Sequence, residues 1–361
     1  MTAPQEARLR PVAWNDLLTA DAGVDRCLDV ILPSALDVFP PLLDEHVDAA
    51  RRHLARWVDE YGLVRKEAAR RRFAHADFAW FAAVTYPSAD ERGLCLIADW
   101  FAWLFLLDDQ FDDGAVGRDP DRVRELMGEM AAVLVHDDGG PRTYPRPAIV
   151  EALADLWRRT TPRTTPAWRH RFVDHIAEGG LAAFWEAENR VRGVVPDEAT
   201  YIEKRRHTGA IYVCMDLIEA VERTEVPARV YADARYQDAL RSACDVVCWI
   251  NDLYSLEKEL SLGEYHNLVA VVEHGRGFSR EQSVRHVVAA ITAEIDLYLE
   301  RESRVLSAFP GHVADVVRNF AGMRSWMRGN LDWSARTKRY RLEGLSAASG
   351  PSDYLDAVAE A

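Results

Sequence analysis

The chain has 361 residues, of which 48% are hydrophobic and 28% are charged, and its formal net charge at pH 7 is −14. This length suffices to bury a large core, and the balance of apolar and charged residues excludes global disorder. The acidic charge argues against nucleic acid or an anionic membrane as a partner, because both reward a basic surface. It leaves room for a local basic pocket that binds phosphate.

The five cysteines and the N-terminus favour a cytoplasmic protein. The cysteines are odd in number and lack CxxC spacing, so they predict buried, reduced thiols rather than disulfides or a zinc site. The N-terminal stretch has no apolar region typical of a signal peptide. The longest apolar run, 100–107, is far too short to cross a membrane. We therefore expect a cytoplasmic location without membrane insertion.

Apolar residues recur with the helical period along almost the whole chain. The first clear segment, 42–61, ends at Gly62, which suits a helix C-cap. The second, 90–113, is long and unusually apolar. The later helical segments are 149–159, 165–190, 196–223, 233–262, 279–306 and 312–333, with loops at 136–147, 192–196 and 223–227.

These segments predict an all-α fold of ten or more helices. The sequence has no strong alternating strand pattern, no internal repeat and no linker that would separate two domains. We therefore expect one domain over 1–345, whose longer helices surround a central apolar cavity. The small, polar segment 346–361 is expected to be a flexible C-terminal tail.

Four aspartates, Asp108, Asp109, Asp112 and Asp113, directly follow the apolar run 100–107. On a helix, Asp108 and Asp112 share a face, where like charges repel, and carboxylates at a helix C-terminus oppose the helix dipole. A bound cation would offset these costs, and oxygen ligands favour Mg²⁺ or Mn²⁺ over zinc. A solvated acidic face is the alternative, although such a face should not adjoin the most apolar stretch of the chain.

A second polar cluster contains Asn251, Ser255 and Glu259, spaced four residues apart after the apolar stretch 244–250. On a helix they form one column of oxygen ligands about 12 Å long. Lys258 lies beside the column and offers a point charge suited to phosphate. A charged solvent face is again the alternative. Two such columns on facing helices predict metal ions at the mouth of an apolar cavity, with a diphosphate that carries an apolar tail as their ligand.

The two clusters resemble the metal-binding motifs of class I terpene synthases, specifically the bacterial single-domain terpene cyclases. The segment 108–113, DDQFDD, matches their motif DDxxD, and the segment 251–259, NDLYSLEKE, matches their motif NDxxSxxKE. Arg205, which lies 46 residues before the second motif, resembles the pyrophosphate-sensing arginine of the family, and Thr208 and Gly209 resemble the helix break that follows that arginine. Arg339 and Tyr340 resemble the RY pair near the C-terminus of these enzymes.

The resemblance implies the α-helical class I terpenoid synthase fold and three Mg²⁺ ions that bind the substrate diphosphate, with Mn²⁺ as a possible substitute. It implies metal ligation by Asp108, Asp112, Asn251, Ser255 and Glu259, and leaves open which of Asp109, Asp112 and Asp113 bind metal. It also implies hydrogen bonds to the diphosphate from Arg205, Lys258, Arg339 and Tyr340, and assigns catalytic roles to Asp108, Arg205, Arg339 and Tyr340.

The implied reaction breaks an allylic C–O bond and needs a dry apolar cavity, because water would quench the carbocation. Helical spacing places three apolar residues on the face of Asp108, and aromatic rings there can stabilise a cation. Ordinary core packing is the alternative for each of these residues. The candidate cavity-wall residues are Phe101, Leu104, Phe105, Gly209 and Trp333, with Phe78, Trp80 and Phe81 as weaker candidates.

The expected function is therefore cyclisation of farnesyl diphosphate to a sesquiterpene hydrocarbon or alcohol, by a monomer or homodimer. Geranyl and geranylgeranyl diphosphate remain open as substrates. A chain-elongating prenyltransferase would need a second DDxxD where 251–259 stands, and a di-iron oxidase would need two ExxH motifs, which are absent from the sequence. A helical scaffold without chemistry would explain the helices but not a column of metal ligands on an apolar helix.

Overall fold

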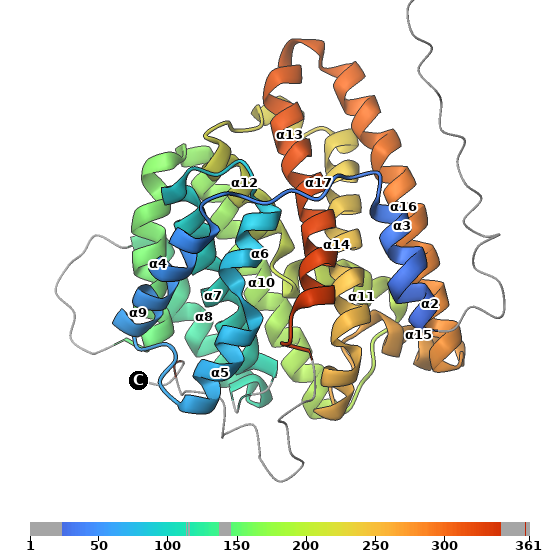
Figure 1. Cartoon of the computed structure of the whole chain (residues 1–361). Coiled ribbons are helices and arrows are strands. Elements are labelled where there is room, and N and C mark those ends of the chain that lie inside the picture. The colour runs from blue at the N-terminus through green and yellow to red at the C-terminus, as the bar shows by residue number, and fades with distance from the viewer. Residues whose placement is uncertain (1–23, 113, 115, 137–145, 341–357, 359–361) are drawn as a thin grey trace, which may run out of the picture.

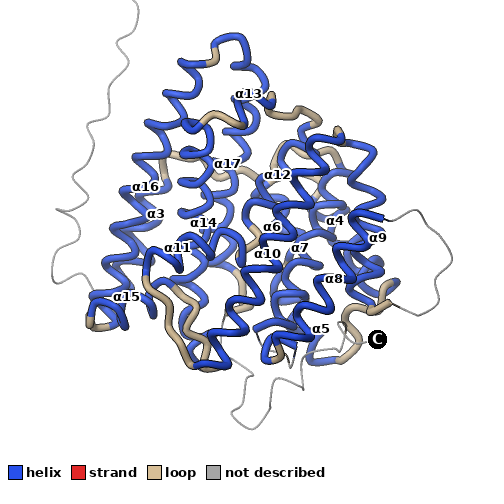
Figure 2. The backbone as a smooth tube through the Cα atoms, turned by 180° about the vertical axis from the view of Figure 1, so that it is seen from behind, coloured by secondary structure: helices blue, strands red, loops and turns tan. Residues whose placement is uncertain are grey.

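The computed structural model describes residues 24–112, 114, 116–136, 146–340 and 358. Within this part all regular secondary structure is helical, as the sequence predicts (Figures 1 and 2). The longest helices are α7 (Glu91–Asp112), α10 (Pro166–Arg192), α14 (Ala234–Ser261), α16 (Arg280–Ala308) and α17 (Val313–Arg336). The other helices of intermediate length are α4 (Val47–Glu60), α5 (Glu67–Ala76), α6 (Phe78–Thr85), α8 (Pro120–His136), α9 (Ala148–Thr160), α11 (Glu198–Thr208), α12 (Ile211–Glu222) and α15 (Leu268–Arg276). The shortest are α2 (Val24–Arg26), α3 (Leu32–Leu36), α13 (Ala228–Tyr231), the π-helical turn η1 (Cys27–Ile31) and the 3₁₀ turns η2 (Val116–Arg118), η3 (Thr161–Arg163) and η4 (Pro310–His312).

Side-chain caps decide where several of the long helices begin. Thr165, Asp197 and Asp233 accept hydrogen bonds from backbone N–H groups in the first turns of α10, α11 and α14. Ser279 and Gln282 form a reciprocal capping box at the start of α16. These caps satisfy N–H groups that have no partner inside the helix, so the ends of the predicted segments and of the observed helices agree closely.

The predicted segment 196–223 forms two helices, with a break at Thr208 and Gly209 as the resemblance implies. The helix α11 ends at Thr208, Gly209 follows, and Ala210 takes the left-handed conformation with a φ of 52° before α12 starts at Ile211. The residues of this break, Thr208 to Ile211, line the central cavity. The helices α6 and α15 had no strong periodic signal, since α6 is apolar on nearly all sides and α15 is short.

The helices pack side by side into one bundle (Figure 1). The helix α14 packs against α16 and α17, α17 against α6, and α6 against α7. On the other side, α7 packs against α4 and α9, while α10 contacts α8, α11 and α12. The central space between the helices is bordered by α6, α7, α10, α11, α12, α14 and α17, which come from both halves of the chain.

The helix α7 is apolar on two opposite faces because both faces are buried. On the outer face, the Trp100 ring N–H donates to the Thr160 hydroxyl at 3.0 Å, and that of Trp103 donates to the Ile149 carbonyl at 2.7 Å. On the inner face, Phe101 and the residues one and two turns later face the central space. This double burial explains the apolar run that precedes the aspartates.

The expected tail 346–361 lies outside the described residues except for Val358. That residue is buried, and its carbonyl accepts a hydrogen bond of 3.0 Å from the backbone N–H of Ile149. None of the described helices is long and apolar enough to span a membrane.

Candidate active site

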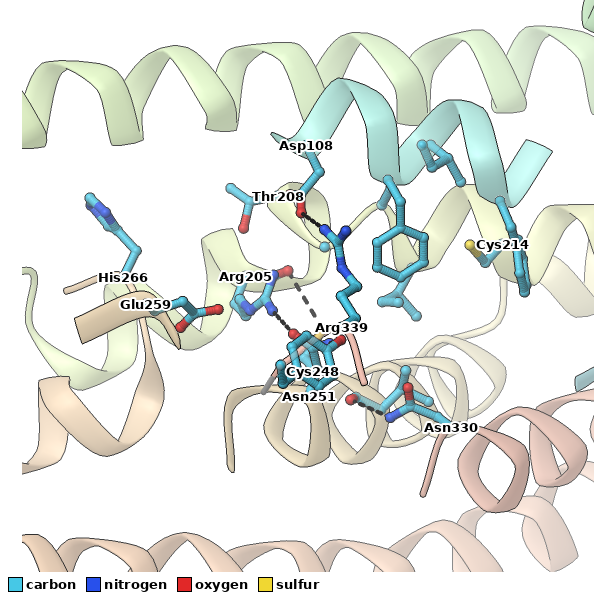
Figure 3. Close-up of a pocket in the computed structure, with 18 of the residues that line it drawn as sticks. Asp108, Arg205, Thr208, Cys214, Cys248, Asn251, Glu259, His266, Asn330 and Arg339 are labelled. Atoms are coloured by element: carbon cyan, nitrogen blue, oxygen red, sulfur yellow. Dashed lines mark hydrogen bonds and ion pairs between the residues drawn. The ribbon is translucent and has the colours of Figure 1, made fainter. Parts of the chain in front are cut away.

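A cavity opens among α7, α12, α14 and α17 and contains about 1020 Å³ of space free of protein atoms, including its open mouth. This is at the upper end of the range of ~300–1,000 Å³ for pockets that bury a small ligand. One end is apolar and lined by Phe81, Phe101, Phe105 and Trp326. The other end is polar and charged, as Figure 3 shows.

Most of the predicted site residues meet in this one cavity. The acidic motif reaches it from α7, the second motif from α14, Arg205 from α11, and the RY pair from the segment after α17. The predicted residues that line it are Asp108, Arg205, Gly209, Asn251, Lys258, Glu259, Arg339, Tyr340, Phe101, Leu104 and Phe105.

Three predicted site residues lie elsewhere or are not described. Ser255 is buried beside the cavity, where its hydroxyl donates to the Asn251 carbonyl at 2.8 Å. Trp333 does not line the cavity, contrary to the prediction, because its ring stacks on Phe81 with centroids 4.2 Å apart and lies behind that ring. Asp112 is the last residue of α7, and its side chain lies outside the described part of the structure.

The first two aspartates of the acidic motif have different surroundings. Both Asp109 carboxylate oxygens accept hydrogen bonds from the Arg339 guanidinium, at 2.9 and 3.0 Å, and Lys258 Nζ lies 3.7 Å away. Asp108 faces the cavity instead, with 43% of its side chain exposed, and its nearest charged partner is Arg339 at 3.6 Å. Asp109 therefore orients basic groups, and Asp108 is the carboxylate available to a ligand in the cavity.

The two carboxyl groups consequently differ in pKa. For Asp108, desolvation by the protein atoms around the cavity mouth raises the pKa, and the charge of Asp109 adds to this effect against the opposing effect of Arg339. For Asp109, burial also raises the pKa, but Arg339, Lys258 and Arg72 outweigh it and hold the pKa well below its usual value. Asp109 is thus the permanently charged member of the pair.

On the opposite wall, a network of hydrogen bonds holds the basic residue Arg205 in place (Figure 3). Its guanidinium donates to the Asp252 carboxylate at 2.8 Å and to the Asn251 amide oxygen at 2.7 Å. The Asn251 amide nitrogen donates to the Tyr340 hydroxyl at 2.7 Å. Asp252 is fully buried and also accepts a hydrogen bond from the Tyr201 hydroxyl at 2.7 Å. The candidate ligands for metal and for diphosphate therefore contact one another directly.

The helix break after α11 brings backbone close to this network. A Cβ atom on Gly209 would lie 3.0 Å from an Arg205 guanidinium nitrogen, 3.1 Å from the Arg205 carbonyl and 3.4 Å from Cys248 Sγ. Gly209 itself has an ordinary φ of −73°, so close approach, and not backbone conformation, favours glycine here. Gly209 thus leaves space for the guanidinium of Arg205.

The donor chemistry of the site fits a hard divalent ion that arrives with its substrate. Among the described residues, no group of three or more His, Cys, Asp or Glu side chains is placed to hold a metal ion. The reason is that Asn251 and Ser255 supply an amide and a hydroxyl oxygen, while Asp108 and Glu259 belong to different helices. Mg²⁺ commonly takes one or two carboxylates and completes its shell with substrate phosphates and water. These residues therefore fit Mg²⁺ together with a diphosphate.

The sequence did not predict several residues of the cavity. At its charged end, Arg190 of α10 contacts Glu264, which also accepts a hydrogen bond from His266. At the apolar end, Trp326 and Asn330 of α17 line the wall, and the Asn330 amide donates to the Val247 carbonyl at 3.0 Å. Trp326 and Asn330 are four residues apart on the helix that precedes the RY pair, so helical spacing predicts that they share a face. This spacing was the one sequence signal that could have indicated them as cavity residues.

Comparison with protein families identifies the domain. Residues 99–296 match the family described as "Terpene synthase family 2, C-terminal metal binding". The chain is 34% identical to pentalenene synthase of Streptomyces exfoliatus over 337 residues, which cover 90% of this chain and 98% of that protein. It is 33% identical to pristinol synthase of Streptomyces pristinaespiralis over 328 residues, or 86% of each chain.

Solved structures give the same answer for the fold. Linalool/nerolidol synthase from Streptomyces clavuligerus superposes with a TM-score of 0.74 at 29% identity, covering 82% of this chain and 98% of that one. Wild-type cucumene synthase superposes with a TM-score of 0.72 at 29% identity, covering 83% and 99%. With an all-helical fold, two facing polar motifs and an apolar cavity between them, the chain belongs to the terpene synthase family and has its class I fold.

Proposed function

We propose that the protein is a Mg²⁺-dependent cyclase that converts farnesyl diphosphate to a sesquiterpene hydrocarbon or alcohol and releases diphosphate. The main support is the placement of Asp108, Asn251 and Glu259 at the mouth of one apolar cavity, together with three basic side chains. A relative from Roseiflexus castenholzii, 32% identical over 303 residues, is named (+)-T-muurolol synthase ((2E,6E)-farnesyl diphosphate cyclizing). Its name supports the C15 substrate.

The metal ligands in this proposal are Asp108 on α7 and Asn251, Ser255 and Glu259 on α14, with Asp112 as a further candidate and three ions per site. When bound, Mg²⁺ neutralises the negative charge that develops on the departing diphosphate. The Asn251 amide oxygen accepts a hydrogen bond from Arg205, which places a candidate metal ligand and a candidate diphosphate donor side by side.

The basic residues bind and orient the diphosphate. Arg205, Lys258 and Arg339 each contact an acidic or amide side chain of the two motifs, so their charged groups are held at the mouth before substrate binds. The Tyr340 hydroxyl is held beside them by Asn251. Donors held in this way lose little freedom when they form charge-assisted hydrogen bonds to the leaving group.

The apolar end of the cavity protects and shapes the carbocation. The rings of Phe81, Phe101 and Trp326 lie against one another, with the Phe81–Phe101 centroids 4.8 Å apart. Their faces and edges exclude water and present π-electrons to a passing cation. Their shape selects how the farnesyl chain folds, and therefore which ring closes first.

The direct test is incubation of the purified protein with geranyl, farnesyl or geranylgeranyl diphosphate and Mg²⁺, followed by gas chromatography with mass detection. The proposal expects a cyclic C15 product from farnesyl diphosphate, with no turnover in EDTA and full recovery on addition of Mg²⁺. Cyclic products only from another chain length would overturn the substrate assignment. Turnover that survives chelation would overturn the role of the metal.

A further inference from the structure

We propose that Asn267 is a positioning residue for the metal site: it holds the Glu259 carboxylate in the orientation that binds the ion. The proposal deepens the proposed function and rests on it, because it requires Glu259 to ligate Mg²⁺. Asn267 belongs to neither of the two motifs. It lies in the turn between α14 and α15, eight residues beyond Glu259, and its side chain is fully buried.

Both ends of the Asn267 amide have defined partners. The nitrogen Nδ2 donates to Glu259 Oε2 at 2.8 Å and to the Asp252 carbonyl at 2.7 Å. The oxygen Oδ1 accepts from the Val269 backbone N–H at 2.9 Å, which caps the N-terminus of α15. If the amide were reversed, its oxygen would face two acceptors, Glu259 Oε2 and the Asp252 carbonyl, and its nitrogen would face the Val269 N–H donor. The network therefore allows one orientation only.

This arrangement suits a residue that orients a metal ligand. Glu259 has a flexible side chain near the end of α14, and its carboxylate points toward Arg205 at the polar end of the cavity (Figure 3). A neutral amide fixes the carboxylate without cancelling its charge, whereas an arginine or lysine in this place would compete with the ion. The Asn267 oxygen caps α15, and the nitrogen donates to the Asp252 carbonyl and to Glu259, both on α14. One amide therefore fixes the Glu259 carboxylate relative to both helices.

Two substitutions separate this role from the cap. Asn267→Ser keeps a capping oxygen but removes the amide N–H groups that donate to Glu259 and to the Asp252 carbonyl. Asn267→Asp keeps the cap while it turns an acceptor toward Glu259. Mutation of a residue that orients a metal ligand typically weakens metal binding 10- to 100-fold. We expect the Mg²⁺ concentration at half-maximal turnover to rise about tenfold or more in both variants. The Mg²⁺ concentration that gives half of the maximal Tm increase in the presence of inorganic diphosphate should rise by the same factor. The loss in kcat at saturating Mg²⁺ should be smaller.

The matched control is Ser279→Ala, which removes the cap of α16, a helix that contributes no residue to the cavity. It should lower the Tm but leave the Mg²⁺ titration unchanged. In a Glu259→Gln background, Asn267→Ser should cause no further loss of Mg²⁺ affinity, because its effect passes through the carboxylate.

Wild-type Mg²⁺ dependence in either Asn267 variant would overturn the positioning role, and so would additive effects in the Glu259→Gln background. If one variant fails to fold, as judged by circular dichroism, the other decides. These outcomes are distinct from failure of the proposed function, which would appear as wild-type protein without Mg²⁺-dependent turnover of farnesyl diphosphate and would overturn both proposals.

Discussion

Arg205 and Arg206 are neighbours in α11, and each forms hydrogen bonds with a buried aspartate of α14. Arg205 contacts Asp252 at 2.8 Å, and Arg206 contacts both oxygens of Asp245, at 2.6 and 2.7 Å. Only Arg205 lines the cavity. The two arginines therefore make similar ion pairs, but only Arg205 is placed to contact a substrate in the cavity.

We expect Arg205→Lys to reduce kcat/KM for farnesyl diphosphate by tenfold or more. A lysine keeps the charge but loses the planar donors, and a charge-assisted hydrogen bond contributes about 1.5–3 kcal/mol. Arg206→Lys should destabilise the protein to a similar extent but leave kcat/KM within about threefold, because neither Arg206 nor its partner Asp245 lines the cavity. Measurements of diphosphate release and Tm test both variants. Equal losses of kcat/KM would show that Arg205 acts only through folding.

Phe101 and Phe105 both line the cavity, one helical turn apart, but only Phe105 supports the charged mouth. The Arg339 guanidinium lies over the Phe105 ring, 4.7 Å from its centroid. Phe101 packs instead against Phe81, Tyr86 and Trp326 at the apolar end.

The two leucine substitutions should therefore have different effects. Phe101→Leu should change the product ratios while diphosphate release stays near the parental rate, because a cation–aromatic contact of about 2 kcal/mol redirects a branch point roughly thirtyfold. Phe105→Leu should change the products and also slow diphosphate release, since Arg339 loses its support. Product chromatograms and release rates for both variants provide the measurement. An unchanged product pattern in Phe101→Leu would show that this ring only fills the core.

At the scale of elements, the break between α11 and α12 makes the site possible. A continuous helix over 196–223 would hydrogen-bond its backbone throughout and would keep α12 on the axis of α11. Instead, the chain turns at Gly209 and Ala210, and α12 brings Ile211 and Cys214 to the cavity wall. The turn therefore places α11, with Arg205, and α12, with part of the wall, on the same cavity.

Gly209→Ala tests this break. The new methyl group would lie 3.0 Å from the Arg205 guanidinium and 3.1 Å from the Arg205 carbonyl, so the guanidinium must move. We expect a loss of tenfold or more in kcat/KM with a cooperative thermal transition retained. Gly128→Ala in α8 is the control, because no atom lies within 4 Å of its new methyl group. That variant should gain up to about 1 kcal/mol of stability and keep full activity. Full activity in Gly209→Ala would contradict the steric interpretation.

For the whole molecule, substrate and metal should stabilise the fold together. Asp108 on α7 and the second motif on α14 both reach the cavity, so a diphosphate with Mg²⁺ would join two of its walls. A ligand at about one hundred times its Kd stabilises the folded state by about 2.7 kcal/mol.

We therefore expect a rise in Tm of several degrees with Mg²⁺ and inorganic diphosphate together, and little change with either alone. Differential scanning fluorimetry with each component, with both and with both plus EDTA measures this. A shift with diphosphate alone that EDTA does not remove would show that the basic residues bind the anion without metal.

The sequence by itself determined the helical fold, the positions of most long helices and the two polar motifs. These properties are local: helical periodicity, capping residues and ligand spacing along one helix depend on neighbours within a few turns. For the same reason helical spacing predicts one shared face of α7 for Phe101, Leu104, Phe105 and Asp108, and all four line the cavity.

Only the tertiary structure decided which residues of different helices meet. The pairing of Asp109 with Arg339 spans 230 residues, and no local pattern indicates that Asp108 faces the cavity while Asp109 does not. Trp333 was expected at the wall but lies behind Phe81, because the packing of α17 on α6 decides which ring is nearer to the cavity. Asn267 reaches Glu259 only because the turn after α14 folds back onto that helix. Such contacts depend on the relative placement of whole helices, which follows from burial summed over the entire core.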